Sequence, residues 1–319
     1  MGTFDLDVKP FSPEGTTPIN GIGLVTIKKD GIEKGPLVIK KQNDSGLEFI
    51  ATSSLREFDD VKTLEVTSSE DDRYMLSELL PGWFAKTVEN AVRDGTYNSN
   101  IAAQVIGNIA HMNFAPVTLT QCSDILPSRI DGEHSYSNEF LRRAERLNVS
   151  KKGQFVESIL ENYVRPIEQY DPVISSGDLH GGNVFTDGTL FDLEAVCIGT
   201  FGADFAKYLI STSNESCVND ILERRSEEVE MIVHQYNQRS QNTASKPEVE
   251  GMLRNHMIHA ALTTGMQRIK DYASTSRDEF GAIAQRNLHL AYNSITEEER
   301  HLWKSELPIA EPISGFTEL

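Results

Sequence analysis

The sequence lacks long apolar runs and the features of an exported or membrane-anchored chain. No apolar stretch approaches the ~18 residues that span a bilayer, and the N-terminus has neither a basic region nor the apolar run of a secretory signal. Leu6 breaks the myristoylation pattern that Gly2 begins. We therefore expect no membrane partner.

Cysteine and positive charge are also scarce. The three cysteines, Cys122, Cys197 and Cys217, are odd in number and have no metal-type spacing, which indicates reduced thiols in a cytoplasmic protein. The net charge of −18 argues against nucleic acid as a partner. This charge fits either a cationic acceptor molecule or an acidic surface that keeps the protein soluble.

The chain is long, and one stretch of it has an informative pattern. At 319 residues it exceeds the roughly 250 to 300 residues at which single cores stop growing, so two lobes are expected.

Asp187-Gly188, between two β-prone segments, predicts a hairpin with a two-residue type I′ turn. In that register Asn183 pairs with Asp192, and opposed Cβ atoms lie about 5 Å apart. An amide oxygen and a carboxylate so placed suit Mg²⁺.

A third oxygen-bearing side chain, Asp178, precedes Asn183 by five residues in a glycine-rich loop. Asp-x-x-x-x-Asn followed by an Asp on the next strand is the arrangement of catalytic and metal-binding residues in kinases. The sequence resembles the aminoglycoside phosphotransferase and choline kinase superfamily in Gly177-Asp-Leu-His-Gly-Gly-Asn183, Asp192-Leu-Glu194, Gly199 and Asp204. The resemblance implies an α+β fold of the protein-kinase-like, bilobal kind.

The resemblance also implies the chemistry of this stretch. Asp178 would orient the acceptor hydroxyl and take its proton. Asn183 and Asp192 would hold Mg²⁺ on the phosphates of ATP. The catalytic loop then spans 176–183 and the metal-binding hairpin spans 183–192.

Four further residues have supporting roles by the same resemblance. Ser176 stands where the superfamily usually has His, and we expect altered loop stiffness without loss of chemistry. His180 orients the loop, and Asp204 bonds the backbone of the loop. Glu194 contacts the metal or a cationic acceptor, or is a surface carboxylate.

Residues 1–80 are expected to form the nucleotide-binding lobe, a small antiparallel sheet. Pro36 to Lys40 resembles the Val-Ala-Ile-Lys strand of kinases, so Lys40 is the candidate phosphate ligand, with Lys41 as the alternative one register away. Gly21 and Gly23 allow backbone amides to approach phosphate, although the loop lacks Gly-x-Gly-x-x-Gly. Strands are predicted at 4–8, 24–28, 36–40, 64–67 and 74–76.

A short helix after the third strand is expected to carry the glutamate that pairs with the strand lysine. Serine is favoured at helix N-caps, and Ser53 is followed by apolar residues at helical spacing. Glu57 is the candidate, and Glu48 and Asp60 are alternatives.

The adenine site is expected where the two lobes join. The exit of the second hairpin, which includes Glu78, Leu79 and Leu80, resembles the hinge whose backbone bonds adenine. Phe185 shares a strand face with Asn183, so it is predicted to lie beneath adenine; ordinary core packing is the alternative.

Residues 81–319 are expected to form the helical lobe that contains the acceptor site. His256 and His259 lie one helical turn apart without a third ligand, so they are interpreted as helix-surface residues and not as a metal site. A capping box is predicted at Thr296. Helices are predicted near 101–109, 137–147, 151–169, 218–238, 248–273 and 278–293.

The sequence therefore predicts an ATP- and Mg²⁺-dependent kinase for a small hydroxylated acceptor such as an aminoglycoside, an amino alcohol or a sugar. A protein kinase is one alternative, but only eleven residues separate Asp192 from Asp204, too few for a long activation segment. A non-catalytic nucleotide-binding scaffold is another, suggested by Ser176 and the imperfect glycine loop. No motif selects the acceptor.

Overall fold

The computed structural model describes residues 5–10, 22–29, 32–41, 47–56, 61–68, 74–78, 86–115 and 126–307. The chain packs as two compact units. The first comprises Met1–Leu126 and Ser176–Val196, and the second comprises Pro127–Ser175 and Cys197–Leu319. The predicted lobe boundary near residue 80 stays a prediction, because residues 79–85 lie outside the described part.

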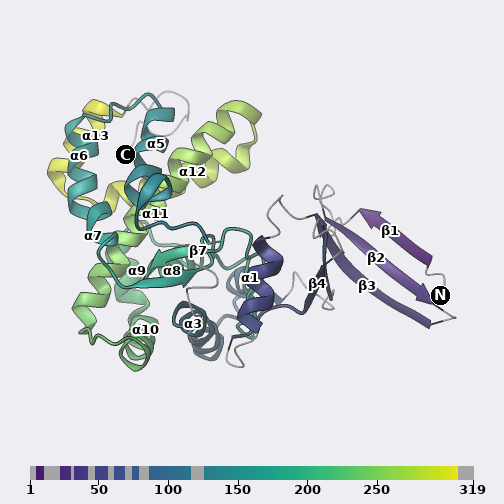
Figure 1. The fold of residues 1–319 in the computed structure, drawn as a ribbon. Helices are drawn as coiled ribbons and strands as arrows, with labels where there is room; N and C mark the ends of the chain where they lie inside the picture. The colour runs from purple at the N-terminus through teal and green to yellow at the C-terminus, as the bar shows by residue number, and fades with distance from the viewer. Residues whose placement is uncertain are drawn as a thin grey trace. The chain divides into compact units, whose positions relative to one another are not determined.

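The first unit contains the predicted antiparallel sheet, which has the order β1-β2-β3-β5-β4. Neighbouring strands pair antiparallel throughout, and Lys40 of β3 lies opposite Met75 of β5. Figure 1 shows β1, β2 and β3 as adjoining arrows of this sheet. The strands are β1 (Asp5–Pro10), β2 (Ile22–Lys29), β3 (Ile32–Lys41), β4 (Val66–Ser68) and β5 (Tyr74–Glu78).

The first helix, α1, starts earlier than predicted. It spans Leu47–Arg56, so Ser53 lies inside the helix and is not its N-cap. Thr52 and Leu55, three residues apart, are both buried and lie on one helix face. Burial of this face outweighs the weak preference of serine for a cap position.

Two more helices complete the first unit. Thr87 caps α2 (Val88–Arg93) and Asn98 caps α3 (Ser99–Asn113), each through its side-chain oxygen. The apolar face predicted in 101–109 is confirmed, since Val105, Ile106 and Ile109 are fully buried.

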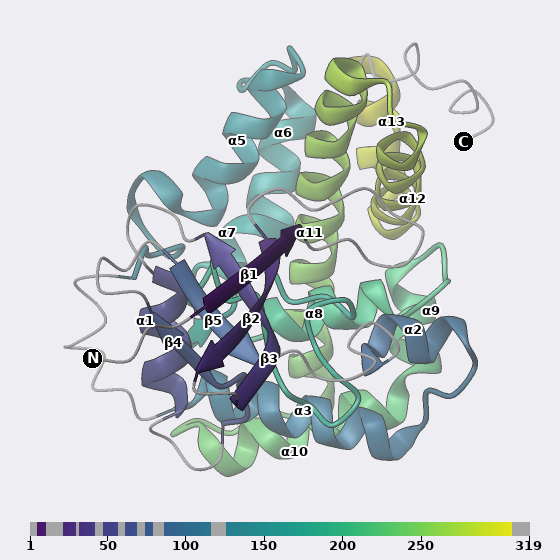
Figure 2. The same ribbon diagram turned by 90° about the vertical axis from the view of Figure 1, so that its right-hand side faces the viewer.

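The second unit is helical around one two-stranded sheet, in which β6 (Pro172–Ser175) pairs antiparallel with β7 (Cys197–Thr200). The long helix α11 packs along α12 and also contacts α5 and α8, and Figure 2 shows α11 beside α12. The helices are α5 (Tyr136–Arg146), α6 (Gln154–Ile159), α7 (Arg165–Ile167), α8 (Ala203–Ser211), α9 (Val218–Arg224), α10 (Ser226–Arg239), α11 (Lys246–Thr275), α12 (Asp278–Ser294) and α13 (Glu297–Glu306). A 3₁₀ turn (Gly132–His134) precedes α5, and a π-helical turn (Leu160–Val164) joins α6 to α7.

Most helix predictions for this unit are confirmed, with one correction. The helix predicted over 218–238 is divided at Arg225, whose backbone leaves the helical region (φ −100°, ψ 24°). The capping box at Thr296 is present, with both reciprocal bonds to Glu299. Among the described residues, no helix is both long and apolar enough to cross a membrane.

Candidate active site

The metal-binding hairpin, 183–192, has a three-residue loop instead of the predicted two-residue one. Val184 pairs with Leu190, which shifts the register by one residue from the predicted pairing. Within the loop only Gly188 has a positive φ, +87°, whereas a type I′ turn would also need one at Asp187. Asp-Gly suits both turns, because a type I turn with a glycine bulge also ends on a left-handed residue.

Asp192 contacts the neighbouring sheet despite this shift. The N–H of Phe191 donates to the carbonyl of Asn183 (3.2 Å), so Phe191 takes the place predicted for Asp192. Asp192 has a left-handed backbone conformation (φ +59°), so the extended backbone of the second hairpin strand ends at this residue. Its carboxylate forms an ion pair with Lys40. A left-handed conformation is uncommon in a non-glycine residue, although aspartate adopts it more readily than most.

The structure distinguishes the two candidate lysines. The Lys40 side chain is 17% exposed; it contacts Asp192, and its Nζ lies 3.3 Å from Oε2 of Glu194. Lys41 is exposed, as expected because successive strand side chains point to opposite faces. Lys40 is thus the lysine that meets the carboxylates.

Asp178 is exposed between two buried neighbours, Gly177 and Leu179. Gly177 has φ +74°, and a Cβ at this position would lie 1.9 Å from the carbonyl oxygen of Ala195. Only glycine fits there, because the turn is left-handed and the backbones touch. This turn leaves the Asp178 carboxylate accessible to a ligand.

Asn183 is tied to the loop that carries Asp178. Its side-chain Nδ2 donates to the backbone carbonyl of Asp178 (3.1 Å), and its N–H donates to the carbonyl of His180 (2.9 Å). Because the amide nitrogen points at Asp178, the amide oxygen points the other way. The predicted role of Asn183 as a metal ligand stays a prediction.

The donor set fits magnesium held jointly with a nucleotide. Asn183 and Asp192 supply hard oxygen atoms, and Mg²⁺ in nucleotide sites is usually held by one or two carboxylates together with substrate phosphates. In the ranges that the structure describes, no group of three or more His, Cys, Asp or Glu side chains could hold a metal.

No protein-family model and no curated protein matches the sequence, but solved structures do. A choline/ethanolamine kinase family protein from Mesorhizobium loti has a TM-score of 0.59 at 12% identity, over 93% of this chain and 91% of that one. Choline kinase from Cryptosporidium parvum has a TM-score of 0.56 at 15% identity, over 98% and 93%. Aminoglycoside 2'-phosphotransferase-IIIa, in its GDP complex, has a TM-score of 0.55 at 10% identity, over 88% and 92%.

The chain has the protein-kinase-like fold. The fold class predicted from the sequence is thereby confirmed. At identities this low the likeness concerns the fold, and the roles of individual residues still depend on the geometry of this chain.

In this kinase-like fold, residues of the predicted catalytic loop themselves help to fix its conformation. Nδ1 of His180 accepts a hydrogen bond from the N–H of Gly182 (3.1 Å), which fits the orienting role predicted for it. Ser176 is buried at the start of the loop.

Two residues beside the loop were also predicted to contribute. Asp204, in the first turn of α8, is buried and accepts from Oγ of Ser175 (3.0 Å), the residue that leads into the loop. The predicted bond of Asp204 to the loop backbone stays a prediction. Glu194 is exposed beside Lys40.

Phe185 is packed more deeply than an adenine contact requires. It is 2% exposed, and its ring stacks on Phe191 with centroids 4.5 Å apart. This placement favours the core role over the predicted contact with adenine.

Several nucleotide-binding predictions remain open. Glu57, Gly21, Leu79 and Leu80 lie outside the described residues, as does the alternative Asp60. Glu48 falls in α1, Glu78 ends β5, and Gly23 lies within β2 opposite Ile39.

Two residues of the first unit were missed by sequence reasoning. Glu89 of α2 donates its N–H to the carbonyl of Gly181 (2.9 Å). A Cβ at Gly182 would lie 2.8 Å from Oε2 of Glu89, so this carboxylate lies over the catalytic loop. Asn108 of α3 bonds the loop of the hairpin (Gly188 O, 2.7 Å). No local sequence signal marks either residue, because both meet the site through long-range contacts.

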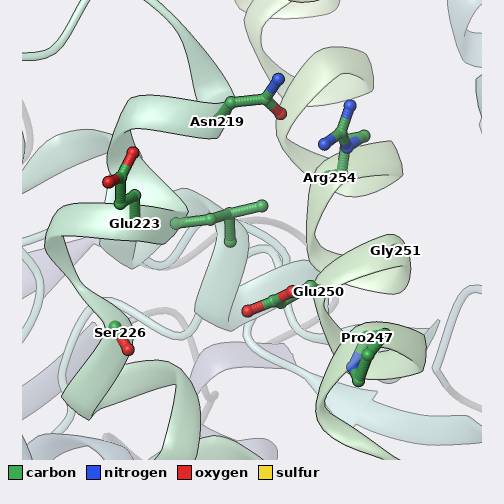
Figure 3. A pocket seen from close by; sticks show the side chains of 8 residues that line it. Asn219, Glu223, Ser226, Pro247, Glu250, Gly251 and Arg254 are labelled. Carbon is green, nitrogen blue, oxygen red and sulfur yellow. The ribbon is translucent and has the colours of Figure 1, made fainter.

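A hollow in the second unit contains none of the predicted site residues. It has a volume of about 450 Å³ and is lined by side chains of α9 and α11, among them Glu223, Glu250 and Arg254. Figure 3 shows these residues on facing helices.

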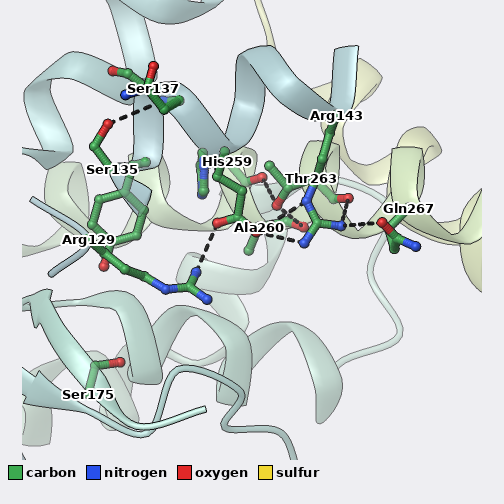
Figure 4. Close-up of polar contacts among 12 residues, drawn as sticks. Arg129, Ser135, Ser137, Arg143, Ser175, His259, Ala260, Thr263 and Gln267 are labelled. Carbon is green, nitrogen blue, oxygen red and sulfur yellow. Dashed lines mark hydrogen bonds and ion pairs between the residues drawn. The ribbon is translucent and has the colours of Figure 1, made fainter. Parts of the chain in front are cut away.

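The second unit also has a buried ionic network (Figure 4). Glu139 pairs with Arg129 (2.9 Å) and Arg143 (2.6 Å). Burial alone would raise the pKa of Glu139, but the charges of Arg129 and Arg143 outweigh it and lower the pKa to about 2.

His256 and His259 are buried close by, so their predicted placement on a helix surface is wrong. Burial lowers the pKa of His256 to about 3 and that of His259 to about 4.

Proposed function

We propose that this protein is a phosphotransferase that moves the γ-phosphate of Mg²⁺·ATP to a hydroxyl of a small molecule. The observation that carries the proposal is the ion pair of Lys40 with Asp192 in a chain with the kinase-like fold. It joins the strand lysine and the metal-binding acid, residues of the kinase template that lie 152 positions apart in the sequence.

Each residue of the site has one role in this proposal. Asn183 and Asp192 hold the metal through oxygen atoms, and Lys40 turns from Asp192 to the nucleotide phosphates. A magnesium ion held there would supply positive charge against the charge that develops on the transferred phosphoryl group. Asp178, exposed and aligned by the Gly177 turn, orients the acceptor hydroxyl and accepts its proton.

The acceptor is proposed to be a small molecule and not a protein. Between Asp192 and Asp204 the chain forms a short turn and β7 and then enters α8. Every residue of this connection is described, and its eleven residues are too few for a long activation segment on which a peptide could dock.

We further propose that the acceptor carries positive charge. The carboxylate of Glu89 lies over Gly182 of the catalytic loop, and Glu194 is exposed beside Lys40. Structural neighbours are named for choline, ethanolamine and aminoglycosides, which are hydroxylated molecules with an amine or ammonium group. A cytoplasmic location and the absence of nucleic acid and membrane partners stay predictions.

An acceptor panel tests the proposal. The wild-type protein is incubated with Mg²⁺·ATP and, separately, with amino alcohols, aminoglycosides and neutral sugars, and the phosphorylated product is measured by mass spectrometry. We expect transfer to at least one cationic acceptor. Tight nucleotide binding without transfer to any acceptor would support the scaffold alternative, and phosphate on proteins alone would support a protein kinase.

A further inference from the structure

The side chain of Asn108 links two segments of the first unit. It is 4% exposed and lies on α3. Its Oδ1 accepts from the N–H of Lys62 (2.8 Å), and its Nδ2 donates both to the carbonyl of Lys62 (2.9 Å) and to that of Gly188 (2.7 Å). Both amide hydrogens are therefore used on backbone groups.

The hairpin loop is also held against α3 by close contact. A Cβ at Gly188 would lie 2.7 Å from the carbonyl oxygen of Gln104, and Gly188 has φ +87°. Glycine is required there for both reasons. The loop thus lies close against α3, and its bond to Asn108 helps to hold it there.

The strands of the hairpin are held by further backbone bonds. On one side, Leu190 donates to the carbonyl of Lys62 (2.9 Å). On the other, Thr186 donates to the carbonyl of Lys86 (2.8 Å), and Val88 donates to that of Val184 (3.0 Å). Since Asn108 fixes Lys62 and the loop together, it determines where the second strand, which leads to Asp192, can lie.

We propose that Asn108 is a positioning residue for the metal site: its amide fixes the hairpin loop and Lys62, and so fixes the strand that leads to Asp192 relative to Asn183, the other proposed magnesium ligand. The inference rests on the proposed function. Without Asn108, the N–H of Lys62 and the carbonyl of Gly188 lose a buried partner, and the hairpin shifts to reach other partners or water.

The chain offers a matched control in its second unit. Asn237 of α10 makes the same two-bond contact with one residue, since its Oδ1 accepts from the N–H of Ala244 (2.8 Å) and its Nδ2 donates to the carbonyl of Ala244 (3.0 Å). Asn237→Ala removes the same kind of amide without touching the hairpin.

The experiment measures binding of a non-hydrolysable ATP analogue by calorimetry, with and without Mg²⁺, to wild type, Asn108→Ala and Asn237→Ala. We expect Asn108→Ala to weaken binding with Mg²⁺ at least about fivefold while binding without Mg²⁺ changes less than about twofold. Asn237→Ala should match wild type in both. Gly188→Ala, which displaces the same loop by a steric clash, should reproduce the effect of Asn108→Ala and serves if that variant does not fold.

Three outcomes separate the explanations. If Asn108→Ala and Gly188→Ala bind the analogue as wild type does, the positioning role is refuted. An equal loss with and without Mg²⁺ also refutes it, because that is the effect of general destabilisation. If wild type itself shows no magnesium-dependent binding, the proposed function fails first and this inference fails with it.

Discussion

The side-chain amide of Asn183 donates a hydrogen bond to the backbone carbonyl of Asp178 at 3.1 Å. This bond closes the catalytic loop on itself, so the proposed base and the proposed metal ligand keep a fixed relation. The side chain of Asn183 therefore links the proposed base, Asp178, to the proposed metal site.

Replacing Asp192 should change the dependence on magnesium. Asp192→Asn removes the negative charge at the proposed metal site, and we expect the Mg²⁺ concentration for half-maximal turnover to rise at least about tenfold. The control is Asp187→Asn in the same hairpin, because asparagine retains the oxygen that accepts from the N–H of Thr189 (3.0 Å). Equal magnesium titrations for both variants would contradict the assignment.

The two strand lysines should differ in their effect on the reaction. Lys40→Met removes the ammonium that reaches the phosphates, and loss of one such contact lowers turnover about a hundredfold. Lys41→Met changes an exposed side chain next to it, and kcat/KM for ATP should stay within about twofold. Steady-state kinetics at saturating acceptor measures both. Comparable losses in the two variants would refute the assignment of Lys40.

Glu89 should affect the choice of acceptor. Glu89→Gln removes the charge of an exposed carboxylate, and such pairs change affinity only modestly, so KM for a cationic acceptor should rise about two- to fivefold. KM for ATP and for a neutral acceptor should not change. A parallel rise for charged and neutral acceptors would show that Glu89 does not recognise charge.

Acid should destabilise the fold through buried histidines. Burial lowers the pKa of His259 from 6.5 to about 4. The unfolded chain therefore takes up a proton below about pH 6.5 that the folded chain refuses. The free energy of unfolding falls as the pH drops from 6.5 toward 4, by up to about 1.4 kcal/mol per pH unit for one such group.

Urea unfolding at several pH values measures this slope. His259→Gln should flatten it, whereas His301→Gln, a change at an exposed histidine of α13, should leave it as in wild type. An unchanged slope in His259→Gln would show that another group controls the acid response.

The sequence predicts the parts of the site that are close together in the chain. Asp178, Asn183 and Asp192 fall within fifteen residues, and the glycines near Asp178 and the pair Asp187-Gly188 indicate a loop and a hairpin. The predicted strand register is wrong by one residue, because Asp-Gly suits both a two-residue type I′ turn and a three-residue loop that ends in a glycine bulge. That Lys40 contacts Asp192 could not be read from the sequence, because this ion pair joins segments that lie far apart in the chain.

Other features could not be predicted because they depend on contacts between distant segments. Asn108 lies 80 residues from Gly188, and an asparagine within a helix gives no sign of such a partner. The buried state of His256 and His259 likewise depends on packing around α11, since helical spacing alone does not tell which face is covered.

The most direct test compares Asp178→Ala with wild type in two measurements on the same preparation, phosphate transfer to the best acceptor of the panel and binding of Mg²⁺·ATP. Loss of a general base lowers turnover about 10²- to 10⁴-fold, and we expect that loss with nucleotide affinity unchanged within about twofold. Asp220→Ala, at an exposed aspartate of α9, should behave as wild type. Undiminished transfer by Asp178→Ala would contradict the account.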